Sequence, residues 1–159
     1  MTSTRTLDRL LAFGRGDAVA IAAPDATALT YGGLRALIVE AIASLNEIGI
    51  GRNDRVAIVL PNGPEMATAF IAIASGATSA PLNPAYRVDE FEFYMSDLGA
   101  KALVVEQGSV SPAIEAAKKL GIVVLTRLIQ KEALGPSLFS AELKRPLRGQ
   151  VWPNGKTSR

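Results

Sequence analysis

Apolar residues along this chain follow two different periods, and their alternation predicts a series of helices and strands. The helical segments carry apolar residues at spacings of three and four, which is typical of one buried face, whereas the strand segments are short apolar runs. The run Arg55–Leu60 (RVAIVL) indicates a strand covered on both faces, as in a parallel sheet. Strand and helix alternate through short links, so we predict an α/β fold with three layers, a mostly parallel sheet between helices.

The elements are bounded by residues that start and stop helices. Thr30 is expected to cap one helix, Asn62 and Glu65 to form a capping box on the next, and Ser111-Pro112 to open the last. A turn is expected at Pro24-Asp25. The expected strands cover residues 18–22, 55–60, 80–82, 101–105 and 122–125, and the expected helices cover 7–13, 30–46, 62–77, 88–98 and 111–120.

The apolar positions of each helix predict which side faces the core. The expected inward residues are Leu34, Leu37, Ile38, Ala41, Ile42 and Leu45; Met66, Ala69, Phe70, Ile73, Ala74 and Ala77; Phe91, Tyr94, Met95 and Leu98; and Ile114, Ala117 and Leu120.

The pattern divides the chain into two parts. Residues 1–126 are expected to form one α/β unit, and residues 127–159 a poorly patterned basic tail. The segment 144–159 contains prolines, glycines and basic residues without an apolar period, so we predict that it is disordered or poorly packed.

Composition narrows the possible chemistry. The chain of 159 residues has no histidine and no cysteine, which excludes a Ser-His-Asp triad, an imidazole base, a thiolate nucleophile and disulfides. A net charge of +2 is too small to indicate nucleic acid binding. No targeting segment is recognised, and the apolar stretch 66–82 is interrupted by Gly76 and Pro81, so we expect no membrane span. A cytoplasmic location is favoured, or a peroxisomal one in a eukaryote.

Short motifs give little chemistry. Gly155-Lys156-Thr157 lacks the glycine spacing, strand and helix of a phosphate-binding loop, and Gly14-Arg15-Gly16-Asp17 holds half of a dinucleotide fingerprint and a cell-adhesion tripeptide; both are interpreted as coincidences. The basic tail could contact phosphates, but a solvated tail is favoured.

Two strand exits carry polar residues that could face a ligand. Asn62 and Glu65 follow one strand and Asn83 follows another, and a structural role is favoured for each over ligand binding. Tyr86, Arg87 and Asp89 come next and are the best exposed polar candidates. No catalytic, cofactor-binding or metal-binding residue is assigned.

Several short segments occur in a distinctive order and spacing. They are Leu29-Thr30-Tyr31, Gly49-Ile50, Asp54–Ile58, Leu60-Pro61-Asn62 with Pro64-Glu65, Gly76-Ala77 and Pro81–Pro84. Taken together, these segments resemble the N-terminal region of AMP-forming acyl-CoA synthetases, within the adenylate-forming superfamily. The similarity runs from about residue 18 to 125, and residues 83–100 are most similar to the oxalate–CoA ligase branch.

This resemblance implies an activity that belongs to a longer protein. Members of the family use ATP and Mg to convert an acid into an acyl-adenylate, which then reacts with CoA. The family's Ser/Thr/Gly-rich phosphate loop and catalytic lysine lie downstream and have no counterpart here. Gly33 also stands where the family often has a Glu that completes the cap on Thr30, so we expect a helix start weaker by about 1 kcal/mol.

Three hypotheses follow from these features. The chain is an inactive N-terminal fragment of a CoA ligase, shortened by a truncated gene, a frameshift or deliberate trimming. Or it works as a piece joined to the rest of the enzyme, or it is a small α/β module that binds another ligand or partner. The first two predict exposed apolar surface, an open sheet edge and self-association or pairing with the missing downstream part. The third predicts a sealed monomer.

Overall fold

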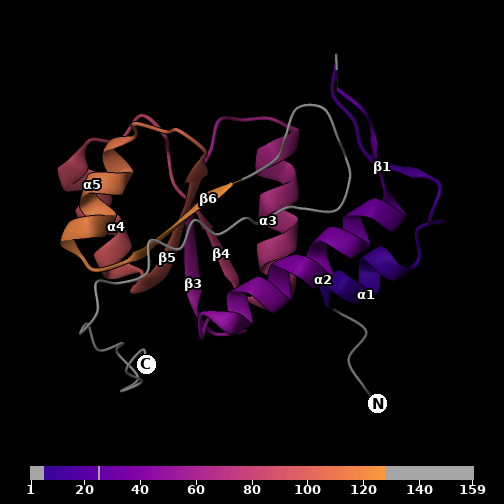
Figure 1. Cartoon of the computed structure of the whole chain (residues 1–159), viewed down its shortest axis with the longest axis horizontal. Coiled ribbons are helices and arrows are strands. Elements are labelled where there is room, and N and C mark those ends of the chain that lie inside the picture. The colour runs from indigo at the N-terminus through magenta and orange to yellow at the C-terminus, as the bar shows by residue number, and fades with distance from the viewer. Residues whose placement is uncertain (1–5, 25, 128–159) are drawn as a thin grey trace.

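A computed structural model describes residues 6–24 and 26–127 of this chain (Figure 1). Asp25, in the turn expected at Pro24-Asp25, lies outside the described residues. Residues 128–159, in the expected tail, lie outside them as well. The described helices are α1 (Leu7–Ala12), α2 (Tyr31–Glu47), α3 (Pro64–Gly76), α4 (Val88–Asp97) and α5 (Pro112–Lys119). The described strands are β1 (Val19–Ile21), β2 (Leu29–Thr30), β3 (Arg55–Val59), β4 (Thr78–Pro81), β5 (Ala100–Glu106) and β6 (Val123–Arg127).

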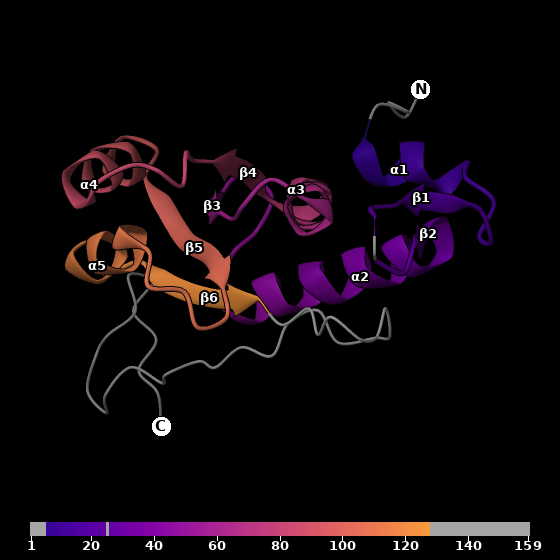
Figure 2. The same cartoon turned by 90° about the horizontal axis from the view of Figure 1, so that it is seen from above.

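The centre of the molecule is a parallel sheet of four strands in the order β4-β3-β5-β6. Figure 2 shows α2 and α3 on one side of this sheet and α4 and α5 on the other. Successive side chains of β3 lie on opposite sides of the sheet. Val56 and Ile58 pack with α2 and α3, whereas Ala57 and Val59 pack with α4 and α5. This arrangement confirms the predicted three-layer α/β fold and explains why β3 is apolar throughout.

A small additional layer lies beyond α2 and α3, away from the sheet (Figure 2). It consists of α1 and an antiparallel pair, β1 with β2. The expected strand at 18–22 is confirmed in shortened form as β1, but its partner β2 was not predicted. With only two residues, β2 is too short to show a strand period, and its Thr30 also caps α2.

The start of α3 corrects the predicted capping box. The N-cap residue is Gly63, not Asn62, and no side chain caps the helix there. Pro64 occupies the first helical position, where its missing N–H and fixed φ are best tolerated, and this preference moves the start one residue past Asn62. Glu65 still folds back toward the helix start, because a Cβ on Gly63 would lie 3.2 Å from its Oε2 atom.

The buried side of α3 also differs from the prediction. Ala69, Ile73 and Ala77 are buried as expected, but Phe70 is 40% exposed, and Thr68 and Ser75 are buried instead. The Thr68 hydroxyl donates to the carbonyl of Pro64 at 2.6 Å, and the Ser75 hydroxyl donates to that of Ile71 at 2.8 Å. With their hydroxyls satisfied inside the helix, these polar residues can face neighbouring elements.

Small residues let α3 approach α2 closely. A Cβ on Gly76 would lie 2.6 Å from Cγ1 of Ile42 on α2, so this position has no room for a side chain. Gly32, at the start of α2, is equally close to the preceding loop: its N–H donates to the Gly16 carbonyl at 2.9 Å, and a Cβ would lie 2.9 Å from the Gly16 oxygen. The glycines at this helix start therefore allow contact between backbones.

The structure also differs from the prediction in smaller details of α4, α5 and β4. On α4, Phe91 and Met95 are fully buried as predicted, but Tyr94 lies at the surface and is 38% exposed. On α5 the buried stripe is Ala113, Ala116 and Ala117, and Leu120, beyond the last helical residue, is 38% exposed. Strand β4 begins at Thr78, two residues earlier than expected, because its backbone pairs with β3 from Arg55 onward.

Candidate functional site

The topology of the sheet selects one edge as the place where a ligand would meet this fold. From β3 the chain moves to β4 on one side, and it then crosses to β5 on the other side of β3. In folds with such a reversal, ligands bind at the carboxyl ends of the two strands between which the direction changes, here β3 and β5. The segments that leave this edge are Leu60–Gly63 after β3, Leu82–Arg87 after β4 and the turn after β5.

The candidate residues after β3 lie at this edge. Asn62 is exposed in the link between β3 and α3, and Glu65 lies in the first turn of α3. A carboxylate at this position interacts favourably with the positive end of the helix dipole. Because Asn62 does not cap α3, the capping role that the sequence predicted for it is wrong.

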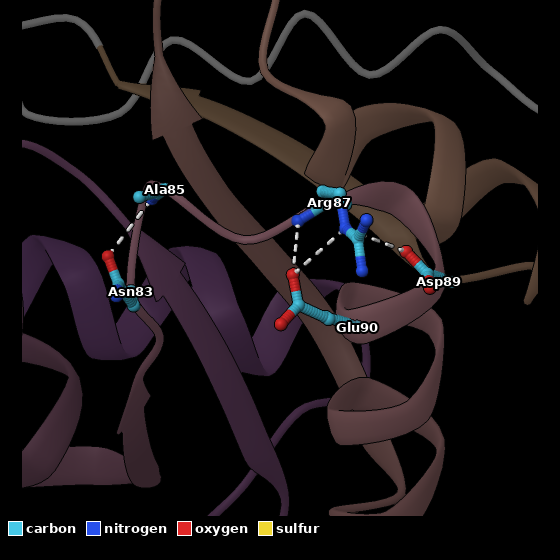
Figure 3. Close-up of polar contacts among 5 residues, drawn as sticks. All are labelled: Asn83, Ala85, Arg87, Asp89 and Glu90. Atoms are coloured by element: carbon cyan, nitrogen blue, oxygen red, sulfur yellow. Dashed lines mark hydrogen bonds and ion pairs between the residues drawn. The ribbon is translucent and has the colours of Figure 1, made fainter.

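The candidate residues after β4 form a tight, self-contained loop (Figure 3). The Asn83 side-chain carbonyl accepts a hydrogen bond from the backbone N–H of Ala85 at 3.0 Å, which is the geometry of an Asx turn. This contact confirms the structural role favoured for Asn83. The loop then leads into α4 through Arg87.

Arg87 and its neighbours stabilise the start of α4. The Glu90 carboxylate accepts a hydrogen bond from the backbone N–H of Arg87 at 2.8 Å, so Glu90 caps the helix. The Arg87 guanidinium lies 3.8 Å from Asp89 and 3.7 Å from Glu90 (Figure 3), and its side chain is exposed. Ion pairs at such an exposed site contribute little to stability, so this trio chiefly fixes the helix start.

Tyr86 completes the loop by joining an aromatic cluster. Its ring stacks on Tyr94 with centroids 5.0 Å apart and meets Phe91 edge to face at 5.7 Å. A side-chain hydrogen bond with Tyr94 raises the pKa of Tyr86 above its usual value, so the phenol stays protonated at neutral pH. Tyr86 thus anchors the loop to α4.

The remaining motifs have structural explanations or lie outside the described residues. Arg15 and Asp17 form a two-point ion pair, with Nη2 to Oδ2 at 2.7 Å and Nε to Oδ1 at 3.2 Å, which lowers the pKa of Asp17. The backbone at Gly16 contacts the start of α2, so the Gly14–Asp17 segment is a packed loop. Gly155-Lys156-Thr157 lies outside the described residues.

Two arginines that were not among the predicted site residues donate hydrogen bonds to backbone carbonyls of distant segments. Arg55, at the start of β3, donates to the carbonyls of Leu98 at 2.6 Å and Gly99 at 3.1 Å, beyond the end of α4. Arg35, on α2, donates from Nη1 to the carbonyls of Leu11 at 3.0 Å and Gly14 at 2.9 Å, at the end of α1. The sequence shows only that each arginine lies next to apolar positions. The carbonyls that it contacts are distant in the chain, so they could not be predicted before the fold was known.

Across residues 6–24 and 26–127, acidic side chains do not gather in groups of three or more that could hold a metal ion. None of the helices in this part of the chain combines the length and apolar composition that a membrane crossing needs.

The chain therefore has the doubly wound class of α/β fold, a parallel sheet between two layers of helices with a topological reversal at its centre. Comparison with known proteins identifies the family within this class. The family model described as AMP-binding enzyme matches residues 11–154. This chain belongs to that family, as its segments in the first half predicted.

Individual relatives agree with this assignment. The chain is 44% identical over 100 residues to an oxalate–CoA ligase of Arabidopsis thaliana, a match that covers 62% of this chain and 20% of that protein. It is 33% identical over 131 residues to an acetyl-coenzyme A synthetase of Streptomyces coelicolor, covering 74% of this chain and 20% of that protein. The fold superimposes on ATP-bound MatB from Rhodopseudomonas palustris with a TM-score of 0.66 at 25% identity, covering 76% of this chain and 25% of that one.

These comparisons also show how much of the length of each relative this chain matches. The chain spans about a fifth of the length of the curated relatives it matches. The predicted similarity to AMP-forming CoA ligases, with the oxalate–CoA ligase branch among the relatives, is confirmed. The described portion corresponds to part of an adenylate-forming domain.

Proposed function

We propose that this chain is the N-terminal α/β portion of an ATP-dependent, AMP-forming acid–CoA ligase, and that it does not activate an acid by itself. The observation that carries the proposal is the match to the AMP-binding enzyme family over residues 11–154, together with coverage of about a fifth of the relatives. The complete ligase would use ATP, Mg and CoA, and oxalate is the first acid to test because of the relative from Arabidopsis thaliana.

The geometry at the carboxyl edge supports a scaffolding role for the portion in hand. Asn83, Tyr86, Arg87 and Glu90 all make contacts within the loop and α4. Adenylation places developing negative charge on phosphate oxygens, and enzymes stabilise it with positioned cations and donors. We therefore propose that residues 1–126 support the catalytic groups of the whole enzyme without supplying them, and that residues 127–159 form a separate basic tail.

Exchange of radiolabelled pyrophosphate into ATP tests this proposal directly. The purified chain is incubated with ATP, Mg and either oxalate or a panel of short and long carboxylic acids. We expect no acid-dependent exchange, because forming the adenylate needs phosphate contacts that the relatives supply from the rest of their length. The Arabidopsis oxalate–CoA ligase, assayed in parallel, shows that the assay detects adenylation.

A matched variant separates real activity from contamination. Phe91 is fully buried, and Phe91→Ala should destabilise the fold by about 3–5 kcal/mol, so exchange that is equally strong in this variant after heating above its unfolding midpoint comes from a contaminating synthetase. Acid-dependent exchange by the wild-type chain that disappears in Phe91→Ala would contradict the proposal. It would show that this portion assembles an adenylation site of its own.

The alternative hypothesis of a sealed binding module has less support. Phe13, after α1, is 82% exposed, and Leu10 and Val39 are exposed as well, but single apolar side chains are ordinary on the surface of a monomer and do not decide between the hypotheses. The family match over residues 11–154 is what favours a portion of a ligase.

A further inference from the structure

The link between β3 and α3 holds an asparagine followed by a glycine, Asn62-Gly63, and both residues are exposed. No side chain caps α3 here, so the Asn62 amide is not held by the helix start. Gly63 is the N-cap, and the first backbone hydrogen bond of α3 runs from the Ala67 N–H to the Gly63 carbonyl at 3.1 Å. The N–H of Gly63 therefore lies outside the hydrogen-bond ladder of the helix.

An asparagine side chain can react with the backbone of the residue that follows it. The backbone nitrogen gives up its proton to a base in the solvent and attacks the side-chain amide carbon. A succinimide ring closes, and the bond to the amide nitrogen breaks, so that this nitrogen takes up a proton and leaves as ammonia. Water then opens the ring at either carbonyl and leaves aspartate or isoaspartate. A following glycine favours ring closure, because it has no side chain to block the attack and its backbone turns readily.

The other asparagines of the described residues are poorly placed for this reaction. Asn46 lies in the last turn of α2, where the helix fixes the backbone. Asn53 precedes Asp54, whose N–H already donates to a backbone carbonyl at 2.9 Å. Asn83 precedes Pro84, which has no N–H to lose. In this part of the chain, the link after β3 is the place where an exposed asparagine precedes a glycine.

We propose that Asn62 is a site of spontaneous deamidation, in which the Gly63 nitrogen displaces ammonia from the Asn62 side chain and water then gives aspartate or isoaspartate at position 62. The reaction needs no co-reactant other than water. It lowers the formal net charge of the chain from +2 to +1, because one neutral amide becomes one carboxylate. The new charge lies before the first turn of α3, which already carries Glu65, at the edge where this fold binds ligands.

The modified chain should stay folded. A carboxylate near the first turn of a helix interacts favourably with the positive end of the helix dipole. Asn62 does not cap α3, so no capping hydrogen bond is lost when its amide is replaced. We therefore expect the product to accumulate as a folded form that is more acidic than the original chain.

Peptide mapping by mass spectrometry measures the reaction. The wild-type chain is incubated in mildly alkaline buffer prepared with water enriched in the heavy oxygen isotope. We expect aspartate and isoaspartate to form at position 62 before they form at Asn46, Asn53 or Asn83. The product should carry a heavy oxygen, because water opens the succinimide. Asn154 also precedes a glycine but lies outside the described residues, so it is quantified on a separate peptide.

Gly63→Ala is the matched variant for this test. The φ of Gly63 is 166°, which is extended backbone that other residues also adopt, and an added Cβ would lie 3.2 Å from Oε2 of Glu65, the end of a flexible side chain. We expect unchanged far-ultraviolet circular dichroism and about tenfold slower modification of Asn62, because the methyl group hinders ring closure. Gly51→Ala is the control, since its Cβ would meet open space and Gly51 does not follow an asparagine.

A second incubation in urea gives the rate at position 62 without the fold and keeps the proposal testable if Gly63→Ala does not fold. Several outcomes would overturn the proposal: position 62 stays unmodified in the folded chain, Asn53 reacts first, the product lacks the heavy oxygen, or folded Gly63→Ala reacts as fast as the wild type. A reaction seen only in urea would mean that the fold protects Asn62. None of these results depends on ligase activity, so this proposal and the proposed function fail separately.

Discussion

At the residue scale, helix starts show which local signals the fold obeys. The N–H of Gly33 donates to the Thr30 hydroxyl at 3.2 Å, and that of Ala113 donates to the Ser111 hydroxyl at 3.2 Å, so both of these predicted caps are confirmed. The cap predicted at Asn62 is wrong, because Pro64 sets the first residue of α3. Two signals competed within four residues, and the preference of proline for the first helical position prevailed.

This difference gives a prediction at single side chains. Thr30→Ala should lower the free energy of unfolding by about 1 kcal/mol, because α2 loses a capped N–H. Asn62→Ala should change it by less than about 0.5 kcal/mol, because Asn62 is exposed and caps nothing. Urea denaturation followed by circular dichroism measures both. Equal losses for the two variants would mean that Asn62 stabilises α3 in solution after all.

At the element scale, contacts far apart in sequence fix how helices meet the sheet. Arg55 joins the start of β3 to the end of α4 through the carbonyls of Leu98 and Gly99. The Lys119 ammonium on α5 lies 2.7 Å from Glu92 on α4, and this hydrogen bond raises the pKa of Lys119. Stability from the Lys119 contact is therefore complete below the normal lysine pKa and declines only as the pH rises through the raised value.

Arg55 provides the sharper test of these contacts. Arg55→Met keeps the apolar stem but removes the donors, so we expect a loss of about 1.5–3 kcal/mol in the free energy of unfolding. The control is Arg52→Met in the preceding loop, whose side chain is exposed and should matter by less than about 0.5 kcal/mol. Urea denaturation of both variants decides. If the two losses are similar, the carbonyls of Leu98 and Gly99 find other donors when Arg55 is removed.

At the scale of the whole molecule, most large apolar residues lie in buried clusters on the two sides of the sheet and beneath α1 and β1, while a few remain exposed. The clusters on the two sides of the sheet hold fully buried residues such as Phe91, Ile58 and Leu103. The outer layer of α1 and the β1–β2 pair leaves Phe13 and Leu10 exposed. Burial, more than residue type, therefore separates the apolar side chains that should matter for stability from those that should not.

Two phenylalanines at the extremes of burial test this division. Phe91→Ala should lower the free energy of unfolding by about 3–5 kcal/mol, because it opens a cavity beside the sheet. Phe13→Ala should change it by less than about 0.5 kcal/mol while reducing the binding of a hydrophobic dye. Thermal unfolding and dye fluorescence measure the two effects. A large loss of stability in Phe13→Ala would show that this side chain is covered in solution.

The sequence alone determined the local secondary-structure elements of this protein and the family to which it belongs. Residue preferences act over a few positions, so the caps at Thr30 and Ser111 and the apolar run of β3 were enough to predict helices, strands and a parallel sheet. The order of short segments such as Pro81–Pro84 was enough to indicate the family.

Only the tertiary structure decided which of these elements meet and which sides they bury. The strand order, the pairing of β2 with β1, and the outward position of Phe70 depend on neighbours distant in the chain. The same is true of the loop residues Asn83 and Tyr86, whose partners show a structural role that their identities left open. Packing between segments that are distant in the chain determines these features. A local sequence pattern does not indicate which distant segment will pack against it.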